Sequence, residues 1–187
     1  MKKVFAVFAM ISMTCLAFGQ QSEITKYITR NGHIRFFSTT PVEDIQADNH
    51  EVSSILDRNS ARFVFQAPIK GFQFEKALMQ EHFNENYMES NKFPQATFDG
   101  TVVNIKDVDF KKQGTYNVTV KGKMTIHGVT KEIEEKGTIT VQGDMVLAKA
   151  KFNIVVADYN IEIPSMVKDK IAKQVEVTVD LKMTGSY

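Results

Sequence analysis

Residues 114–128 carry the most regular pattern of the chain, reading Gly-Thr-Tyr-Asn-Val-Thr-Val-Lys-Gly-Lys-Met-Thr-Ile-His-Gly. From Tyr116 to Ile126, apolar residues or glycine alternate with polar residues. Successive side chains of a strand point to opposite faces, so the pattern predicts one long strand with a dry and a wet face. Long one-sided strands are typical of curved antiparallel sheets and closed barrels. His127-Gly128 then predicts a tight hairpin, because glycine tolerates a positive φ.

Shorter runs of similar character occur along the rest of the chain. Asn31-Gly32 predicts a hairpin between the first two runs, and the polar residues 41–49 predict a loop. Phe72 and Phe74 resume alternation on the opposite parity, as a bulge would require. The sequence therefore predicts an all-β fold, an extended antiparallel barrel of about eight strands, because sandwich strands are usually shorter. The other predicted strands are 24–29, 33–38, 51–56, 62–69, 96–105, 129–141, 145–156 and 175–183.

One main helical insertion interrupts the strands. Residues 75–90 contain Ala, Leu, Met, Gln and Glu but no Gly or Pro, a composition that favours helix. Met79, Phe83 and Tyr87 form one apolar stripe, with Leu78 and His82 beside it. A second, short helix is predicted after Pro164.

The first 19 residues predict a secretory signal peptide. Two lysines precede an apolar run that is too short for a transmembrane helix, and Ala17-Phe18-Gly19 fits a cleavage site. Cys15 lies in a poor lipoprotein context, so we expect cleavage near Gly19 rather than a lipid anchor. The expected organisation is a signal peptide at 1–19 and one domain at 20–187, located in the periplasm or secreted.

Charge and composition argue against several classes of function. Without Lys2 and Lys3 the mature chain has 21 basic and 22 acidic residues, a net charge of −1, which disfavours nucleic-acid binding. Its only cysteine leaves with the signal peptide, so no disulfide is expected. No serine lies in a Gly-x-Ser-x-Gly context and no phosphate loop is present, so we expect no enzyme. The four histidines show no ligand spacing, so no metal site is predicted.

Glu135 receives two interpretations. A two-residue loop at His127-Gly128 would pair Val120 with Glu135 and would place the carboxylate on the dry face. An unpaired carboxylate there is costly. Either a bulge near Glu134 turns Glu135 outward, or its polar group lies inside a cavity and can orient a ligand headgroup.

Two segments together resemble the YceI-like family. The first is Asn-Glu-Asn-Tyr-Met-Glu-Ser-Asn-Lys-Phe-Pro at 84–94, followed by Ala96-Thr97-Phe98. The second is Lys-Gly-Lys-Met-Thr-Ile-His-Gly-Val-Thr-Lys at 121–131. The resemblance implies an exported, lipocalin-like antiparallel barrel that carries a polyisoprenoid or another long-chain amphiphile. No cofactor is implied beyond such a lipid.

The interior of the barrel is either packed or hollow. Small residues on the wall strands favour a cavity, as does the resemblance, because a filled barrel needs bulk there. They are Gly100, Gly122, Gly137, Ala148 and Ala150. The residues expected to line the cavity and bind the ligand are Phe36, Phe63, Phe65, Met79, His82, Phe83, Phe98, Val102, Tyr116, Val118, Val120, Met124, Glu135, Phe152, Ile154, Val177 and Val179.

The leading functional hypothesis is therefore an exported carrier that sequesters a long-chain, polyisoprenoid-like lipid. The alternative is an exported barrel with a packed interior that binds another protein on its outer surface. Neither hypothesis requires a membrane span, and both are compatible with a homodimer. Under the cavity interpretation, Gly122→Leu should lower the amount of bound lipid and leave the stability of the ligand-free protein largely intact.

Overall fold

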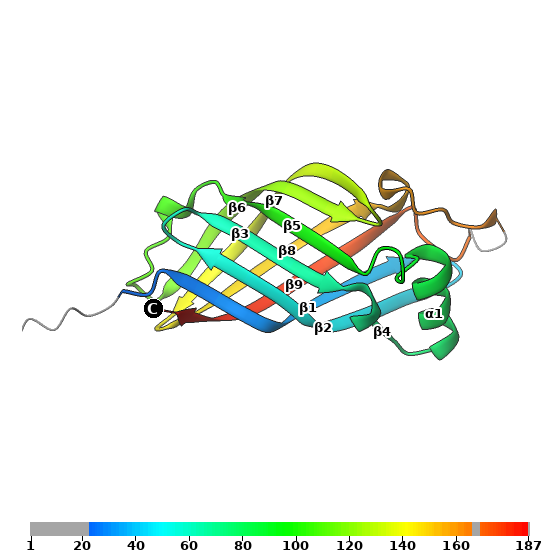
Figure 1. Ribbon diagram of the computed structural model, residues 1–187, viewed down its shortest axis with the longest axis horizontal. Helices are drawn as coiled ribbons and strands as arrows, with labels where there is room; N and C mark the ends of the chain where they lie inside the picture. The colour runs from blue at the N-terminus through cyan, green and yellow to red at the C-terminus, as the bar shows by residue number, and fades with distance from the viewer. Residues whose placement is uncertain (1–22, 166–168, 187) are drawn as a thin grey trace, which may run out of the picture.

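The computed structural model describes residues 23–165 and 169–186, so the predicted signal peptide lies outside the described residues. Part of the short helix predicted after Pro164 also lies outside them. Eight long strands form a closed antiparallel barrel in the order β1-β9-β8-β7-β6-β5-β3-β2, with β2 pairing back to β1 (Figure 1). The predicted all-β antiparallel barrel is confirmed. The strands are β1 (Lys26–Thr39), β2 (Asp44–Asp57), β3 (Arg62–Pro68), β4 (Gln73–Phe74), β5 (Gln95–Val102), β6 (Gly114–Ile126), β7 (Val129–Gln142), β8 (Met145–Val155) and β9 (Gln174–Ser186).

The β6–β7 hairpin has the register that the alternation predicts. Ile126 pairs with Val129 and Val120 with Glu135, and the ladder continues without a shift to Gly114 and Val141. Both turn residues adopt positive φ, 50° at His127 and 75° at Gly128, as a two-residue turn that matches strand twist requires. Since no bulge interrupts β7 on this side, Glu135 stays on the inner face.

Asn31-Gly32 does not form the predicted hairpin, because β1 runs straight through it from Lys26 to Thr39. Gly32 keeps a negative φ, so the chain bends instead of turning back. Thr29 pairs with Ser54 and Gly32 with Val52, which leaves two residues of β1 opposite one residue of β2. The dipeptide therefore belongs to a bulge, which bends a strand without ending it.

The predicted loop at 41–49 is also wrong for most of its length, because β2 begins at Asp44. Asp and Asn are depleted in strands, so their number here masked the pattern. Asn49 is fully buried yet satisfied, since its Nδ2 donates to the Pro68 carbonyl at 2.8 Å and its Oδ1 accepts from the Glu51 amide at 2.8 Å.

The segment after β3 is more broken than the sequence suggested. Instead of a bulge, a 3₁₀ turn, η1 (Ile69–Gly71), separates β3 from β4, which pairs with β2. The predicted 75–90 helix is shorter and consists of an α-helical part, α1 (Ala77–His82), and a π-helical part, η2 (Phe83–Tyr87). Neither part has a buried residue, so both lie at the edge of the fold, where tertiary packing cannot support a longer helix.

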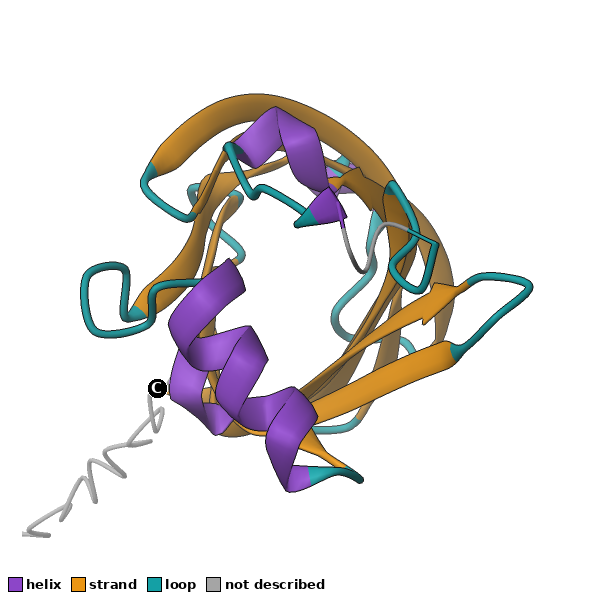
Figure 2. Cartoon of the chain, turned by 90° about the vertical axis from the view of Figure 1, so that its right-hand side faces the viewer, coloured by secondary structure: helices purple, strands orange, loops and turns teal. Residues whose placement is uncertain are grey.

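The two ends of the barrel differ. At the narrow end, where β1 begins, residues 103–113 with η3 (Ile105–Asp107) cover the barrel (Figure 1). There Val108 is buried, and the Phe110 ring stacks on Tyr27 with the ring centroids 5.4 Å apart. The open end, where β1 ends, carries α1 and η2 on one side and η4 (Val156–Tyr159) on another (Figures 1 and 2).

Gly100 and Gly122 pair directly across β5 and β6. A Cβ on Gly122 would overlap the Cα of Gly100 and would lie 2.5 Å from the backbone oxygen of Asp99. These two glycines therefore permit close approach of two backbones and do not make room for a ligand, which overturns the expected tolerance of Gly122→Leu. Among the helices of residues 23–165 and 169–186, none has the length and apolarity needed to cross a bilayer.

Candidate functional site

A cavity of about 430 Å³ occupies the barrel toward its open end. Its walls are almost entirely apolar and come from every barrel strand except β7, and from α1, η2 and the segment after η4. Its volume lies in the range of roughly 300–1,000 Å³ that is typical of small-molecule sites. Prominent lining residues are Ile34, Phe36, Ile45, Phe65, Ala67, Phe72, Phe74, Met79, Phe83, Tyr87, Ala96, Met124, Phe152, Ile154, Ile161, Ile163, Val175 and Val177.

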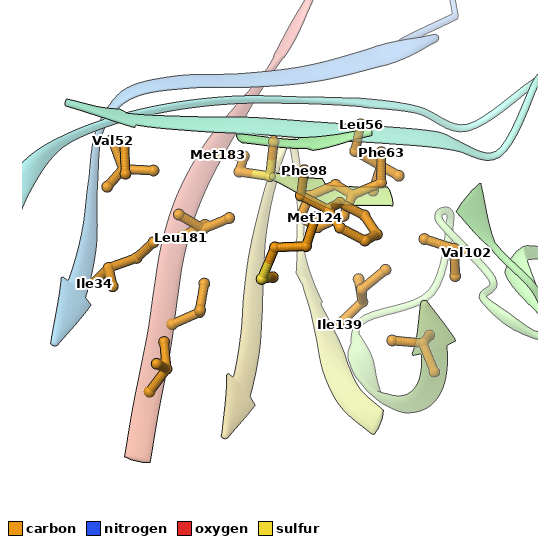
Figure 3. Packing of buried hydrophobic residues seen from close by; sticks show 14 of the residues in the cluster. Ile34, Val52, Leu56, Phe63, Phe98, Val102, Met124, Ile139, Leu181 and Met183 are labelled. Carbon is orange, nitrogen blue, oxygen red and sulfur yellow. The ribbon is translucent and has the colours of Figure 1, made fainter. Parts of the chain in front are cut away.

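A second cavity of about 50 Å³ lies deeper in the barrel. Phe65, Met124 and Phe152 line both cavities, and Met124 lies with Phe63 and Phe98 in the middle of the interior (Figure 3). These three shared side chains separate the two spaces. Because methionine has three rotatable bonds, Met124 is the member of this partition that can move at least cost.

Nearly all of the residues predicted to line the interior lie on one of these cavities. The large cavity holds Phe36, Phe65, Met79, His82, Phe83, Met124, Phe152, Ile154 and Val177. The deep cavity holds Phe63, Phe98, Val102, Val118, Val120, Glu135 and Val179, with three residues shared. Tyr116 is the exception, since it lines neither cavity. Its hydroxyl donates to the Asp109 and Lys112 carbonyls at 3.3 and 3.2 Å and so helps hold the loop that covers the narrow end.

Four phenylalanines form one aromatic cluster beside the mouth of the large cavity. Phe83 of η2 stacks on Phe36 of β1, with the centroids 5.4 Å apart, and lies 5.0 Å from Phe74 and 5.6 Å from Phe72. The apolar stripe predicted for the helix thus faces the cavity. Phe83 thus packs η2 against the barrel wall, and α1 is held by the hydrogen bond that the Phe74 amide donates to Gln80 Oε1 at 3.2 Å.

The rim of the large cavity is charged. Lys76 Nζ and Glu43 Oε1 form an ion pair at 2.9 Å, and Lys170 and His82 also line the rim. The hydrogen bond from Lys76 lowers the pKa of the Glu43 carboxyl, and Lys170 acts in the same direction. Two cations and one carboxylate therefore surround an otherwise apolar opening.

Glu135 lies on the deep cavity, as one of its two sequence interpretations required. Burial raises the pKa of its carboxyl, and no cation among the described residues offsets that effect. Glu135 is only half-buried because β7 pairs with β8 only from Gly137 to Gln142. Glu135 lies outside this paired segment, where β8 does not cover β7. A carboxyl placed this way can accept a hydrogen bond from a ligand or, once protonated, donate one.

His127 ties the open end together. Its Nε2 lies 2.9 Å from Glu89 Oε2 and its Nδ1 lies 3.2 Å from the Tyr159 carbonyl. The Phe93 ring meets the imidazole edge-on, with the centroids 4.6 Å apart. One turn residue thereby links the end of the helical insertion, the β6–β7 hairpin and η4.

Sequence reasoning missed most of the rim and part of the wall. Glu43 lies in the segment predicted to be a loop, and Lys76 lies near the start of the predicted helix, outside its apolar stripe. Ile161 and Ile163 alternate with polar residues, which is the one signal that marked them as facing inward.

Comparisons with known proteins agree on the fold. A polyisoprenoid binding domain from Saccharophagus degradans, implicated in plant cell wall breakdown, superimposes with a TM-score of 0.77 at 13% identity, covering 88% of this chain and 100% of that one. Burkholderia cenocepacia BcnA gives a TM-score of 0.65 at 13% identity, covering 81% and 95% of the two chains. A Campylobacter jejuni YCEI protein gives 0.53 at 13% identity, covering 100% and 99%.

No curated protein sequence matches the chain. The model of the YceI-like domain family matches residues 19–183, which is nearly the whole of the chain. This match confirms the resemblance found in residues 84–98 and 121–131. On this evidence the chain belongs to the YceI-like domain family.

Proposed function

We propose that this protein is an exported carrier that sequesters a long-chain amphiphilic lipid, polyisoprenoid-like in its chain, inside the barrel. The observation that carries the proposal is the 430 Å³ apolar cavity, which opens at one end of the barrel and is covered at the other. The mechanism is binding and release, and it involves no reaction of the lipid.

The cavity's chemistry favours a long apolar chain over a small polar solute. Each buried methylene contributes about 0.8 kcal/mol. Ten buried carbons would contribute roughly 8 kcal/mol, whereas association costs roughly 4–15 kcal/mol. Tight binding therefore needs a chain longer than about ten carbons, which the large cavity and the deep cavity together would accommodate if Met124 moved aside.

The structural neighbours support the same class of ligand. One of them is described as a polyisoprenoid binding domain, and it covers 88% of this chain in superposition. At 13% identity, this similarity establishes a shared fold but does not indicate which lipid is bound. The chain length and headgroup of the lipid must be inferred from the size of the cavity and the charges at its rim.

The charged rim suits the polar end of the ligand. Lys76, Lys170 and His82 line the mouth of the large cavity, so an anionic or hydroxyl headgroup would meet them there while the chain points toward Met124. Glu135 would then contact only a chain that reaches the deep cavity.

Organic extraction of the purified protein followed by mass spectrometry tests the proposal. We expect a stoichiometric long-chain lipid from the wild type. Val175→Trp, which fills the large cavity from β9, should lower the recovered lipid severalfold. Thr178→Trp on the outer face of the same strand is the control and should leave it unchanged. Empty extracts from repeated preparations, or equal yields from both variants, would contradict the carrier hypothesis.

A barrel with a packed interior that acts only through its outer surface finds no support in the cavities described above. Export rests on the signal peptide predicted at residues 1–19. Mass analysis of the N-terminus of exported material tests it, with a start at Gln20 expected. A lipid-modified Cys15 would instead place the protein on a membrane by an anchor.

A further inference from the structure

Three potential metal ligands meet on the outer face of β1 and β2, away from both cavities. One ligand atom from each of His33, Asp48 and His50 lies within 4.8 Å of the other two. His33 Nε2 is 2.6 Å from Asp48 Oδ1. The two imidazole rings stack with centroids 4.4 Å apart and planes 8° from parallel. All three side chains are accessible to a solute, being half-buried or exposed.

Paired bulges bring these residues together. Gly32 pairs with Val52 and Ile34 pairs with Asn49, so two residues of β2 lie opposite His33 alone. A bulge re-aims the side chains at its position, and here it turns His50 outward against His33. Arg35 pairs with Asp48 on the next rung. Because 17 positions separate the two histidines in sequence, no spacing rule could detect the cluster.

The donor set suits a transition metal. Two imidazole nitrogens and one carboxylate oxygen are the ligands found at catalytic zinc sites and at open iron sites. Zinc bonds of about 2.0–2.2 Å place neighbouring donor atoms about 3.3 Å apart. The His33–Asp48 contact of 2.6 Å would therefore have to widen, and any donor pair near the 4.8 Å limit would have to shorten, which rotation of these surface side chains can provide.

Asp48 also has ordinary partners. Arg35 Nε donates to its Oδ1 at 2.8 Å and Gln46 Nε2 donates to its Oδ2 at 3.2 Å. Burial of the carboxylate opposes ionisation, but the hydrogen bonds from Arg35, His33 and Gln46 prevail and lower the pKa of Asp48. These partners account for an ion pair, but they do not require a second imidazole stacked on the first.

We propose that His33, Asp48 and His50 form a surface site for a divalent transition-metal ion such as Zn²⁺, with at least one coordination position left for water or an outside donor. Arg35 competes with the metal for Asp48, so the site binds moderately rather than tightly. The site is separate from the lipid cavity, and its test does not depend on whether the protein carries a lipid.

Calorimetric titration of the full chain with Zn²⁺ tests the site. We expect one equivalent bound with a micromolar Kd. His50→Phe keeps a ring against His33 but removes the donor nitrogen, and it should weaken binding at least tenfold. Asp180→Asn is the matched control. Asp180 of β9 pairs with His33 of β1 but lies outside the cluster, so the affinity for Zn²⁺ should change less than about threefold.

Arg35→Gln provides a second test, because removing the competing guanidinium should increase the affinity for Zn²⁺ severalfold. A cluster with a purely structural role would show no such increase. Co²⁺ provides an independent readout, since its visible absorption should appear with wild type and disappear with His50→Phe. Absence of binding by the wild type at 1 mM Zn²⁺, or equal affinity in His50→Phe, would overturn the proposal.

Discussion

The narrow half and the open half of the barrel are built from the same strands but are filled in opposite ways. Toward the narrow end, Val52, Val146 and Met183 are all 0% exposed and line neither cavity. Figure 3 shows Val52 and Met183 among the packed side chains of the interior. Near the open end, the same strands carry half-buried side chains around a 430 Å³ cavity. The strand pattern alone does not distinguish a filled interior from a hollow one. What differs is the cover: residues 103–113 pack onto one end, while α1 and η2 lie at the rim of the other.

The largest expected effect comes from adding volume where the two halves join. Gly122→Ala should cost about 3 kcal/mol or more, because its Cβ would overlap the backbone of Gly100 and no side chain can move away. Denaturant unfolding measures the loss. Gly114→Ala on the same strand is the control, since the nearest atoms to its Cβ would be side-chain atoms of Tyr116 at 3.5 Å or more. A tolerated Gly122→Ala would mean that β5 and β6 lie farther apart than described.

Truncating a buried side chain should destabilise the protein more in the filled half than in the hollow half. Met183→Ala in the filled half should cost roughly 3–4 kcal/mol, because Met183 is fully buried and lines neither cavity, so the truncation opens a new void. Ile154→Ala at the large cavity should cost the ligand-free protein about 1 kcal/mol, since part of its surface already faces empty space. Parallel unfolding of the two variants gives the difference, and equal losses would remove the distinction between the halves.

Met124→Ala should join the two cavities. We expect a loss of roughly 2 kcal/mol in the ligand-free protein and a shift of the extracted lipids toward longer chains. Met124→Leu conserves most of the volume and should keep the wild-type lipid profile. If the alanine variant extracts the same chain lengths as wild type, Met124 does not separate the cavities.

The smallest effect concerns Glu135. Burial raises the pKa of its carboxyl above the ordinary 4.5, so the folded state binds the proton more tightly than the unfolded state. The wild type therefore loses stability as pH rises from 4.5 through the raised value. Glu135→Gln should remove that loss and be about 1 kcal/mol more stable at neutral pH.

Below pH 4.5 the advantage of Glu135→Gln should vanish, because the wild-type carboxyl is then protonated in both states. Unfolding of both proteins at several pH values measures this difference. A constant difference between the two proteins across pH would mean that Glu135 is fully solvated.

Local sequence patterns are sufficient to predict the barrel. Alternation fixed which residues of β6, β7, β8 and β9 face inward, and the two-residue turn at His127-Gly128 fixed the β6–β7 register to its far end. These features are local, since a strand's period and a turn's φ angles depend on neighbouring residues alone. The same locality allowed the family resemblance to be recognised from two short segments.

Which part of the interior is filled and which is hollow depends on contacts between strands that are distant in the sequence. In the sequence, Gly122 and Gly137 look like space for a ligand, yet a Cβ on either would overlap a neighbouring backbone, that of Gly100 in the first case and that of Lys149 in the second. Asn31-Gly32 marks a bulge and not a hairpin because β2 and β9 hold β1 on both sides. The charged rim and the His33–Asp48–His50 cluster join residues far apart in the chain. Such features depend on distances between strands, which no pattern within one strand contains.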